Sequence, residues 1–180
     1  MRKRTGLILA VALVGALALT ALASYGAAGP TKGNLKSKRM SGYLEVPSVS
    51  TSGRGTIETR IRNGSKIDYK LTYSGLSGNP SAAHIHFAQP SANGGVVAFL
   101  CGGGGKPACP ASTSGTVSGT IIAADIQALA SQGIAAGEFA EVAAAMKAGF
   151  TYANVHTTLF PGGELRGQIS PSGSGDGDDD

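Results

Sequence analysis

The alternation of apolar and polar residues in two consecutive segments is the feature that most limits the folds open to this chain. In residues 55–62, Ile57, Thr59 and Ile61 share one face, and residues 66–73 alternate in the same way. Asn63-Gly64 stands between the two segments and is a strong signal for a tight hairpin turn. Because such alternation is typical of half-buried antiparallel strands, the sequence predicts an antiparallel sheet.

Other segments extend this sheet, and one region departs from it. After residue 122 the apolar period becomes helical, which predicts two short helices over 125–132 and 138–147, ending near Gly133 and Gly149. We therefore predict a mainly β protein, an antiparallel β-sandwich or barrel with a short two-helix insertion. The remaining strands are expected at 43–46, 82–87, 96–100, 115–122, 152–158 and 164–169.

The last two strands are expected to form a hairpin around Pro161-Gly162-Gly163. Paired residues must lie on one face of a sheet, so even-numbered residues must pair with even-numbered ones. A three-residue loop meets this condition. It predicts that His156 lies opposite Gln168 and that Thr158 lies opposite Arg166.

The first 23 residues have the pattern of an export signal. Arg2, Lys3 and Arg4 precede an uncharged run from 6 to 23 that ends in a small-x-small site, Ala21-Leu22-Ala23. Cleavage near Ala23 would deliver the protein outside the cytoplasm, as a secreted, periplasmic or cell-envelope protein. The alternative is an uncleaved N-terminal anchor, because the run approaches the length that spans a bilayer; this would be the chain's contact with a membrane.

The rest of the chain divides by composition into three parts. Residues 24–39 are rich in Gly, Ala and Lys and are interpreted as a linker, and residues 40–170 hold enough apolar sequence for a single β domain. Residues 171–180 form a Pro-Ser-Gly-Asp tail that is too polar to fold. The basic residues near the linker lack interleaved aromatics, and no nucleic-acid partner is expected.

The chain has two cysteines, Cys101 and Cys109, on either side of a glycine-rich stretch. In an oxidising compartment they are expected to form a disulfide. Their spacing is unlike a Cys-x-x-Cys metal site, and no histidine is near them in sequence.

The three histidines are the main candidates for chemistry. His84 and His86 are two residues apart in a predicted strand, so their side chains leave the same face. His156 lies on the polar face of another predicted strand. If the two strands are neighbours, three imidazoles with an open position would suit Zn or Cu, although no cofactor is required by the sequence.

The alternative is a purely hydrogen-bonded cluster. In this interpretation the histidines bond to the polar residues Asn154, Glu164 and Gln168 and to the backbone. Arg166 is expected on the same face and favours this interpretation, because a fixed cation repels a metal ion. The separation between the His84–His86 pair and His156 decides between the two.

Other catalytic patterns are absent from the sequence. There is no Gly-x-Ser-x-Gly motif, and the glycines at 102–105 are followed by Lys106-Pro107 rather than by a phosphate-loop Lys-Ser/Thr. Glu164 and Asp68 have no evident partner for a glycosidase pair. An enzyme is therefore less expected than a binding protein.

Several motifs in order resemble the CHRD domain, a family named for repeats in the animal protein chordin. They are the segments 42–47, 71–76 and 83–86, then Tyr-Ala-Asn-Val-His-Thr at 152–157 and Pro-Gly-Gly-Glu-Leu-Arg-Gly-Gln-Ile at 161–169. The resemblance covers about residues 40–170 and implies a β-sandwich or barrel domain of exported proteins, many of them bacterial. In chordin such domains belong to an antagonist of secreted growth factors, whereas bacterial members have no established activity.

The leading functional expectation is a non-enzymatic interaction module of the cell envelope or medium, with an unidentified extracellular or envelope protein or ligand as its partner. The alternative is a His-based Zn- or Cu-binding protein, which includes a metal-dependent enzyme.

Overall fold

The structure is a computed structural model that describes residues 34–37 and 39–171. The expected export signal and most of the expected linker and tail lie outside these residues. The elements are β1 (Asn34–Lys36), β2 (Met40–Ser41), the 3-10 turn η1 (Gly42–Leu44), β3 (Arg54–Arg62), β4 (Lys66–Ser74), β5 (Pro80–Phe87), β6 (Gly95–Cys101), β7 (Gly115–Ile122), the 3-10 turns η2 (Ala123–Asp125) and η3 (Ala130–Gln132), α1 (Phe139–Lys147), β8 (Thr151–Thr157) and β9 (Leu165–Pro171).

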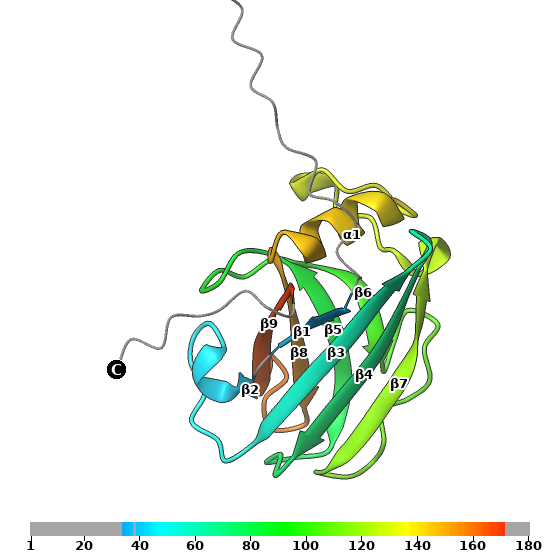
Figure 1. The fold of residues 1–180 in the computed structure, drawn as a ribbon. Helices are drawn as coiled ribbons and strands as arrows, with labels where there is room; N and C mark the ends of the chain where they lie inside the picture. Colours follow the sequence, from blue (N-terminus) through cyan, green and yellow to red (C-terminus); the bar gives the residue numbers. More distant parts are fainter. Residues whose placement is uncertain (1–33, 38, 172–180) are drawn as a thin grey trace, which may run out of the picture.

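The described strands form one nine-stranded sheet in the order β6-β5-β8-β9-β1-β3-β4-β7, with β2 pairing to β3 and β9. All the pairings are antiparallel, as predicted. The sheet curls over, so that β3, β4 and β7 lie in front of β5, β6 and β8 (Figure 1). The two sides meet where the Tyr69 hydroxyl of β4 donates to the Leu100 carbonyl of β6 at 2.7 Å.

The β3–β4 hairpin forms as the alternation predicts. Ile57 pairs with Leu71 and Thr59 with Tyr69, and all four side chains are buried. Asn63 and Gly64 both have positive φ, which suits the turn and explains the residue types there. The buried face of this hairpin supplies one wall of the core.

A short strand and a turn near the N-terminal side differ from the prediction. Asn34–Lys36 pairs with both β3 and β9, although it falls in the stretch expected to be a linker. The strand expected at 43–46 is instead the 3-10 turn η1 followed by a loop. A side chain at Gly42 would collide with the Val49 carbonyl, because the chain turns back on itself there.

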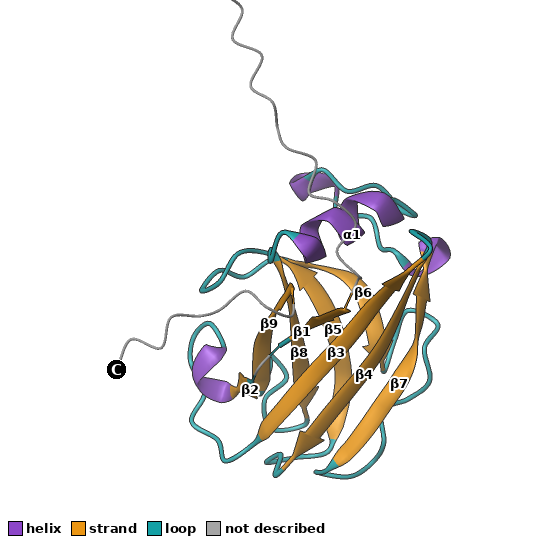
Figure 2. Cartoon of the chain, in the orientation of Figure 1, coloured by secondary structure: helices purple, strands orange, loops and turns teal. Residues whose placement is uncertain are grey.

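The predicted pair of helices is only half right. Glu138–Lys147 was expected as a helix, and α1 covers Phe139–Lys147 with Phe139, Val142, Ala143 and Met146 buried. The first expected helix, 125–132, is wrong, because that segment forms parts of η2 and η3 and an irregular stretch. The Gln127 N–H donates to the Val97 carbonyl of β6, so contact with the sheet edge replaces helical hydrogen bonds. Figure 2 shows these helical elements gathered at one end of the sheet.

The register of the last hairpin is also different from the prediction. Gln168 lies opposite Tyr152 rather than His156, and Arg166 lies opposite Asn154 rather than Thr158. The loop is longer than three residues because Thr157 N–H donates to the Phe160 carbonyl and Glu164 N–H to the Val155 carbonyl. The shift is an even number of residues, so every side chain keeps its predicted face.

Cys101 and Cys109 form the expected disulfide.

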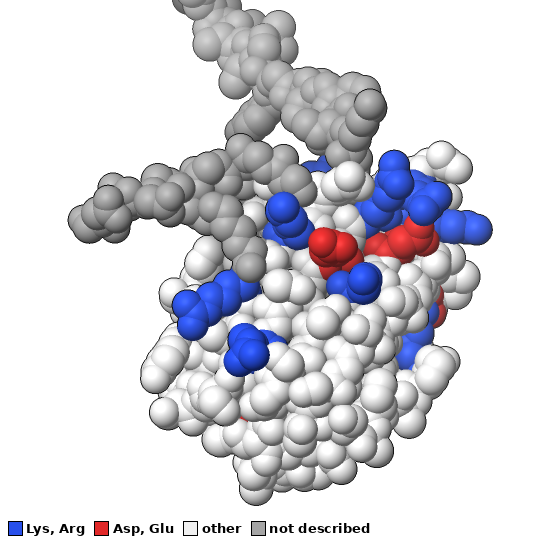
Figure 3. Space-filling view, turned by 60° about the horizontal axis from the view of Figure 1, so that its bottom comes forward, with Lys and Arg blue, Asp and Glu red and all other residues white. Residues whose placement is uncertain are grey.

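The helices in the described part of the chain are short, and the charge on one face of the molecule is uneven. In residues 34–37 and 39–171 no helix is long and apolar enough to cross a membrane. Figure 3 shows Lys and Arg side chains over the upper part of one face, while its lowest part carries almost no charge.

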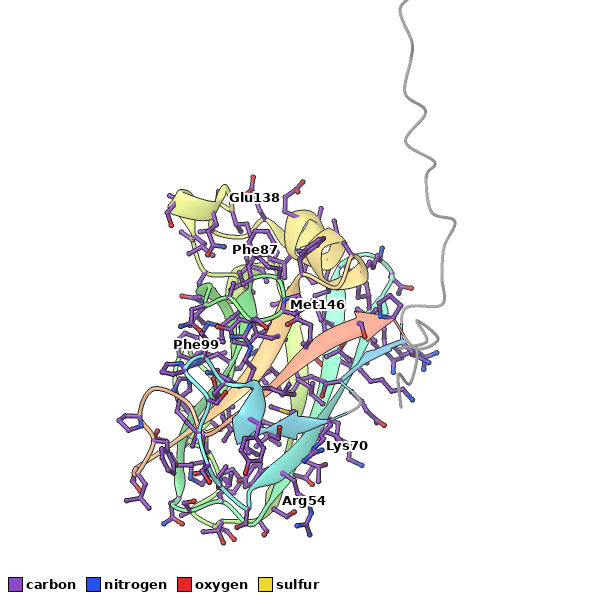
Figure 4. The ribbon with its side chains drawn as sticks, turned by 90° about the vertical axis from the view of Figure 1, so that its left-hand side faces the viewer. Arg54, Lys70, Phe87, Phe99, Glu138 and Met146 are labelled. Carbon is purple, nitrogen blue, oxygen red and sulfur yellow. A yellow bond between two sulfur atoms is a disulfide. The ribbon has the colours of Figure 1, made fainter. Side chains whose placement is uncertain are left out.

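We expect α1 to hold the end of the sheet closed through Met146, which is 0 % exposed and points from the helix towards the strands (Figure 4). Met146→Ala leaves a cavity and should lower the free energy of unfolding by about 2–5 kcal/mol. The neighbouring exposed Lys147→Ala serves as the control and should change it by less than about 0.5 kcal/mol. Urea denaturation measures both, and equal effects of the two changes would contradict this packing.

Candidate functional site

The three histidines lie together on one face of the sheet. β5 pairs with β8, which places His84 opposite Asn154 and His86 opposite Tyr152, while His156 lies opposite Ala82, two residues further along β8. The Nδ1 of His84 is 3.1 Å from the Nε2 of His156. One ring nitrogen from each of the three histidines lies within 4.8 Å of the others. The two strands are therefore neighbours, which a shared histidine cluster requires.

Asn154 occupies the centre of this cluster. Its side-chain oxygen Oδ1 is 2.9 Å from Nε2 of His86 and 3.0 Å from Nε2 of His156. The residue is only 3 % exposed. One amide group thus contacts two of the three imidazoles.

Backbone carbonyls fix the orientation of two of the rings. The Nδ1–H of His86 donates to the Gly94 carbonyl at 2.9 Å, and the Nδ1–H of His156 donates to the Pro161 carbonyl at 2.9 Å. In a neutral imidazole only one nitrogen carries hydrogen, so both Nε2 atoms then present lone pairs to the centre of the cluster. This is the arrangement found around metal-ligating histidines, whose second nitrogen donates to a carbonyl or carboxylate.

Aromatic rings pack against the outer sides of the histidines. Phe99 of β6 meets His84 edge to face, with ring centroids 4.6 Å apart. Phe99 is labelled in Figure 4, and its ring lies next to Gly103 and Gly104 of the loop that follows β6. Tyr152 stacks in parallel on His86 at 4.7 Å. These contacts hold the rings in place and partly shield them from water, since His86 is buried and His84 and His156 are half-buried.

The loop 88–94 covers the polar face next to this site. Arg166 is 2 % exposed and donates to the carbonyls of Gln89 and Ala92 and to the side chain of Asn93. Its guanidinium also lies 3.5 Å from the centre of the Tyr152 ring. The buried cation is therefore satisfied by carbonyl oxygens and an aromatic face.

Glu45 is a second buried charged group near the cluster. It is 7 % exposed, and its Oε1 has no hydrogen-bond partner among the described residues. Burial raises the pKa of its carboxyl to about 7, although Arg166 opposes this rise. Sequence reasoning did not single out Glu45, because no local pattern shows that the loop after η1 folds over this face.

The other expected members of the polar cluster are bonded elsewhere. The Glu164 carboxylate accepts hydrogen bonds from Thr51 and Thr157 and from the Ser77 N–H, at 2.7–2.8 Å. Burial opposes ionisation of Glu164, but these donors outweigh it and lower its pKa. Gln168 donates to the carbonyls of Ala88 and Gly149. Of the four polar residues, Asn154 is the one that the structure brings into hydrogen-bond contact with the histidines.

The electrostatic environment favours neutral histidines. Burial lowers the pKa of all three imidazoles, and for His84 the neighbouring His156 and His86 lower it further, to about 3. Hydrogen bonds to carbonyls partly offset this for His86 and His156. Neutral imidazole is the form that binds a metal ion, so these rings need not lose a proton at neutral pH.

Acidification is expected to destabilise the metal-free protein through these histidines. Because their pKa values are lowered by folding, the unfolded chain takes up protons first, and stability falls as the pH drops from 6.5 towards the His84 pKa of about 3. Glu45 acts in the opposite sense between 4.5 and about 7, because its pKa is raised. His84→Gln removes one of these contributions, so its free energy of unfolding should depend less steeply on pH below 6.5. Urea denaturation across this range tests the difference, and identical slopes for the two proteins would refute it.

Comparisons with known proteins bear on the family of the chain. The model of the family described as CHRD domain matches residues 37–169. No curated protein and no solved structure matches the chain. Because the family model covers most of the sequence, the chain belongs to the CHRD-domain family.

Proposed function

We propose that this CHRD-domain protein binds a transition-metal ion, Zn²⁺ or Cu²⁺, through His84, His86 and His156. The observation that carries the proposal is the convergence of three ring nitrogens within 4.8 Å. Two of the rings have their other nitrogen held by a backbone carbonyl, as metal ligands do. Three imidazoles are a ligand set that both ions accept.

The spacing of the nitrogens fits a shared ion for one pair and requires movement for the trio. Two ligand atoms that each lie about 2.1 Å from a tetrahedral metal ion are about 3.4 Å apart. The separation of 3.1 Å between His84 and His156 is close to this value, whereas the widest separation in the trio, up to 4.8 Å, must shrink by about 1 Å or more. Such a change requires side-chain torsions of the imidazoles to shift on metal binding.

The hydrogen-bonded alternative has fewer supporting contacts than the sequence suggested. Glu164 and Gln168 use their polar groups on Thr51, Ser77, Thr157 and backbone carbonyls. Arg166 was expected to repel a metal, and it does oppose positive charge at His86, although three oxygen acceptors and the Tyr152 ring surround its guanidinium. Within the trio, His84 and His156 share a hydrogen bond, whereas Asn154 Oδ1 faces two imidazole nitrogens, and a cation would satisfy the acceptors there.

Metal binding by the mature protein is the direct test. We expect the wild type to bind about one equivalent of Zn²⁺ or Cu²⁺, measured by elemental analysis after loading and dialysis. His86→Ala and His156→Ala each remove a ligand and should weaken binding by more than about 100-fold. Thr158→Ala is the matched control, because Thr158 is exposed and directly follows β8; this variant should bind the metal as the wild type does. Less than about 0.1 equivalent bound to the wild type would end the proposal.

We also propose that the protein is exported, so that this site lies outside the cytoplasm. The signal-like residues 1–23 and the cleavage motif ending at Ala23 support it. The Cys101–Cys109 disulfide is consistent with an oxidising compartment. A secreted, periplasmic or envelope protein would meet metal ions there without competition from cytosolic thiols.

A second candidate function is an interaction module of the cell envelope or medium. The observation that favours it is Tyr43, which is 66 % exposed at the shared edge of two clefts of about 620 and 330 Å³. Its neighbour Leu44 is 47 % exposed. Aromatic residues at the edge of a cleft are common anchors for protein partners. Neither cleft is lined by a histidine of the trio.

The partner surface can be separated from the metal site by substitution. We expect Tyr43→Ser with Leu44→Ser to reduce capture of an envelope or extracellular protein about tenfold or more, because an exposed anchor is lost. Ile122→Ser, an exposed apolar residue on β7, is the matched control. Quantitative capture from envelope extract measures both variants, and equal capture by all three proteins would count against this surface.

A further inference from the structure

The side-chain oxygen of Asn154 lies between two of the three histidines, and the role inferred for it below rests on the metal proposal above. The Nε2 atoms of His86 and His156 are acceptors when the rings are neutral, because their Nδ1–H groups are bound to carbonyls. The Asn154 Oδ1 that faces both of them is also an acceptor. Asn154 Oδ1 therefore cannot hydrogen-bond to either Nε2, although it lies 2.9 Å from one and 3.0 Å from the other, whereas the His156 Nε2 also has the His84 Nδ1 within 3.1 Å.

Two arrangements remove this conflict. A metal ion between the atoms accepts all three lone pairs, and a carboxamide oxygen is then a further ligand. Alternatively, the Asn154 amide turns over, so that its NH₂ group donates to both imidazoles. Both arrangements use the same side chain in the same place, because the oxygen and nitrogen of an amide are nearly equal in size.

The surroundings of Asn154 suit the first arrangement in the orientation observed. The Asn154 Nδ2 and the Glu45 Oε1 lie 3.0 Å and 2.5 Å from the point where a Cβ on Gly163 would stand. Gly163, with a φ of 126°, therefore leaves room beside its backbone for both side chains. With Oδ1 towards the histidines, the Nδ2 end of the amide lies on the same side as Glu45, whose Oε1 has no hydrogen-bond partner among the described residues.

We propose that the side-chain oxygen of Asn154 is the fourth ligand of the metal, and that the same amide is reversed in the metal-free protein. Three imidazole nitrogens and one amide oxygen fill the four positions that Zn²⁺ uses in closed sites. Such a centre holds its ion without a free position for a substrate. The site is thereby assigned to metal retention rather than to metal-dependent turnover.

Competition titration with a Zn²⁺ chelator on the mature protein tests this role. Asn154→Ala should raise the Zn²⁺ Kd about 10–100-fold, whereas the matched control Asn79→Ala, an exposed asparagine, should leave it unchanged. Asn154→Asp keeps an oxygen in place and adds charge, so its Kd should equal that of the wild type or be lower.

Thermal unfolding supplies a readout that a merely structural asparagine would not give. An aspartate cannot donate to the imidazoles, so Asn154→Asp should have a lower Tm than the wild type without metal. Saturating Zn²⁺ should then raise the Tm of this variant by more than it raises that of the wild type.

The outcomes separate this inference from the proposed function. Asn154→Ala binding Zn²⁺ as tightly as the wild type would overturn the role of Asn154 while leaving the histidine site intact. If Asn154→Ala does not fold, a folded Asn154→Asp with tenfold weaker binding overturns it in the same way. Wild-type protein that binds neither Zn²⁺ nor Cu²⁺ would instead remove the metal proposal itself.

Discussion

The pairing of β5 with β8 is the interaction on which the candidate site depends. It joins segments whose histidines are 72 residues apart and aligns His84 with Asn154 across the strands. The pairing of β8 with β9 extends the same row to Arg166. Because β8 lies between two partners, its backbone polar groups are used on both edges and its side chains are held at fixed spacing. A cluster built on such a strand is more rigid than one built on loops.

Much of this arrangement follows from period-two patterns in the sequence. Alternation predicted that His84 and His86 lie on one face of their strand, and that Asn154 and His156 lie on one face of theirs. The β3–β4 hairpin could be placed from Asn63-Gly64. The adjacency of β5 and β8 could not be derived, since strand order depends on contacts far apart in the chain. The last hairpin shows a similar limit, because hydrogen bonds within the 158–164 loop, and not its glycines alone, set the register.

The first predicted helix was wrong, and the contacts of the polar face were foreseen only in part, for a related reason. Residues 125–132 have a helical composition, but the free edge of β6 offers the Val97 carbonyl to the Gln127 N–H. The histidines were expected to bond to Asn154, Glu164, Gln168 and the backbone; Asn154 and backbone carbonyls contact them, whereas loop 88–94 supplies carbonyls to Arg166 and Gln168. In both cases tertiary contacts override a pattern that is local.

Covering the polar face makes protonation of the histidines unfavourable. A buried imidazole gains a proton only by placing a charge in a poorly solvated site, and this cost lowers the pKa of each ring. The nearby Arg166 lowers the pKa of His86 further. A divalent metal ion has a larger desolvation cost than a single proton, but it forms direct bonds to several lone pairs at short range, which offset that cost. In the metal proposal, the covered face therefore supplies three neutral imidazoles, one buried and two half-buried, as ligands.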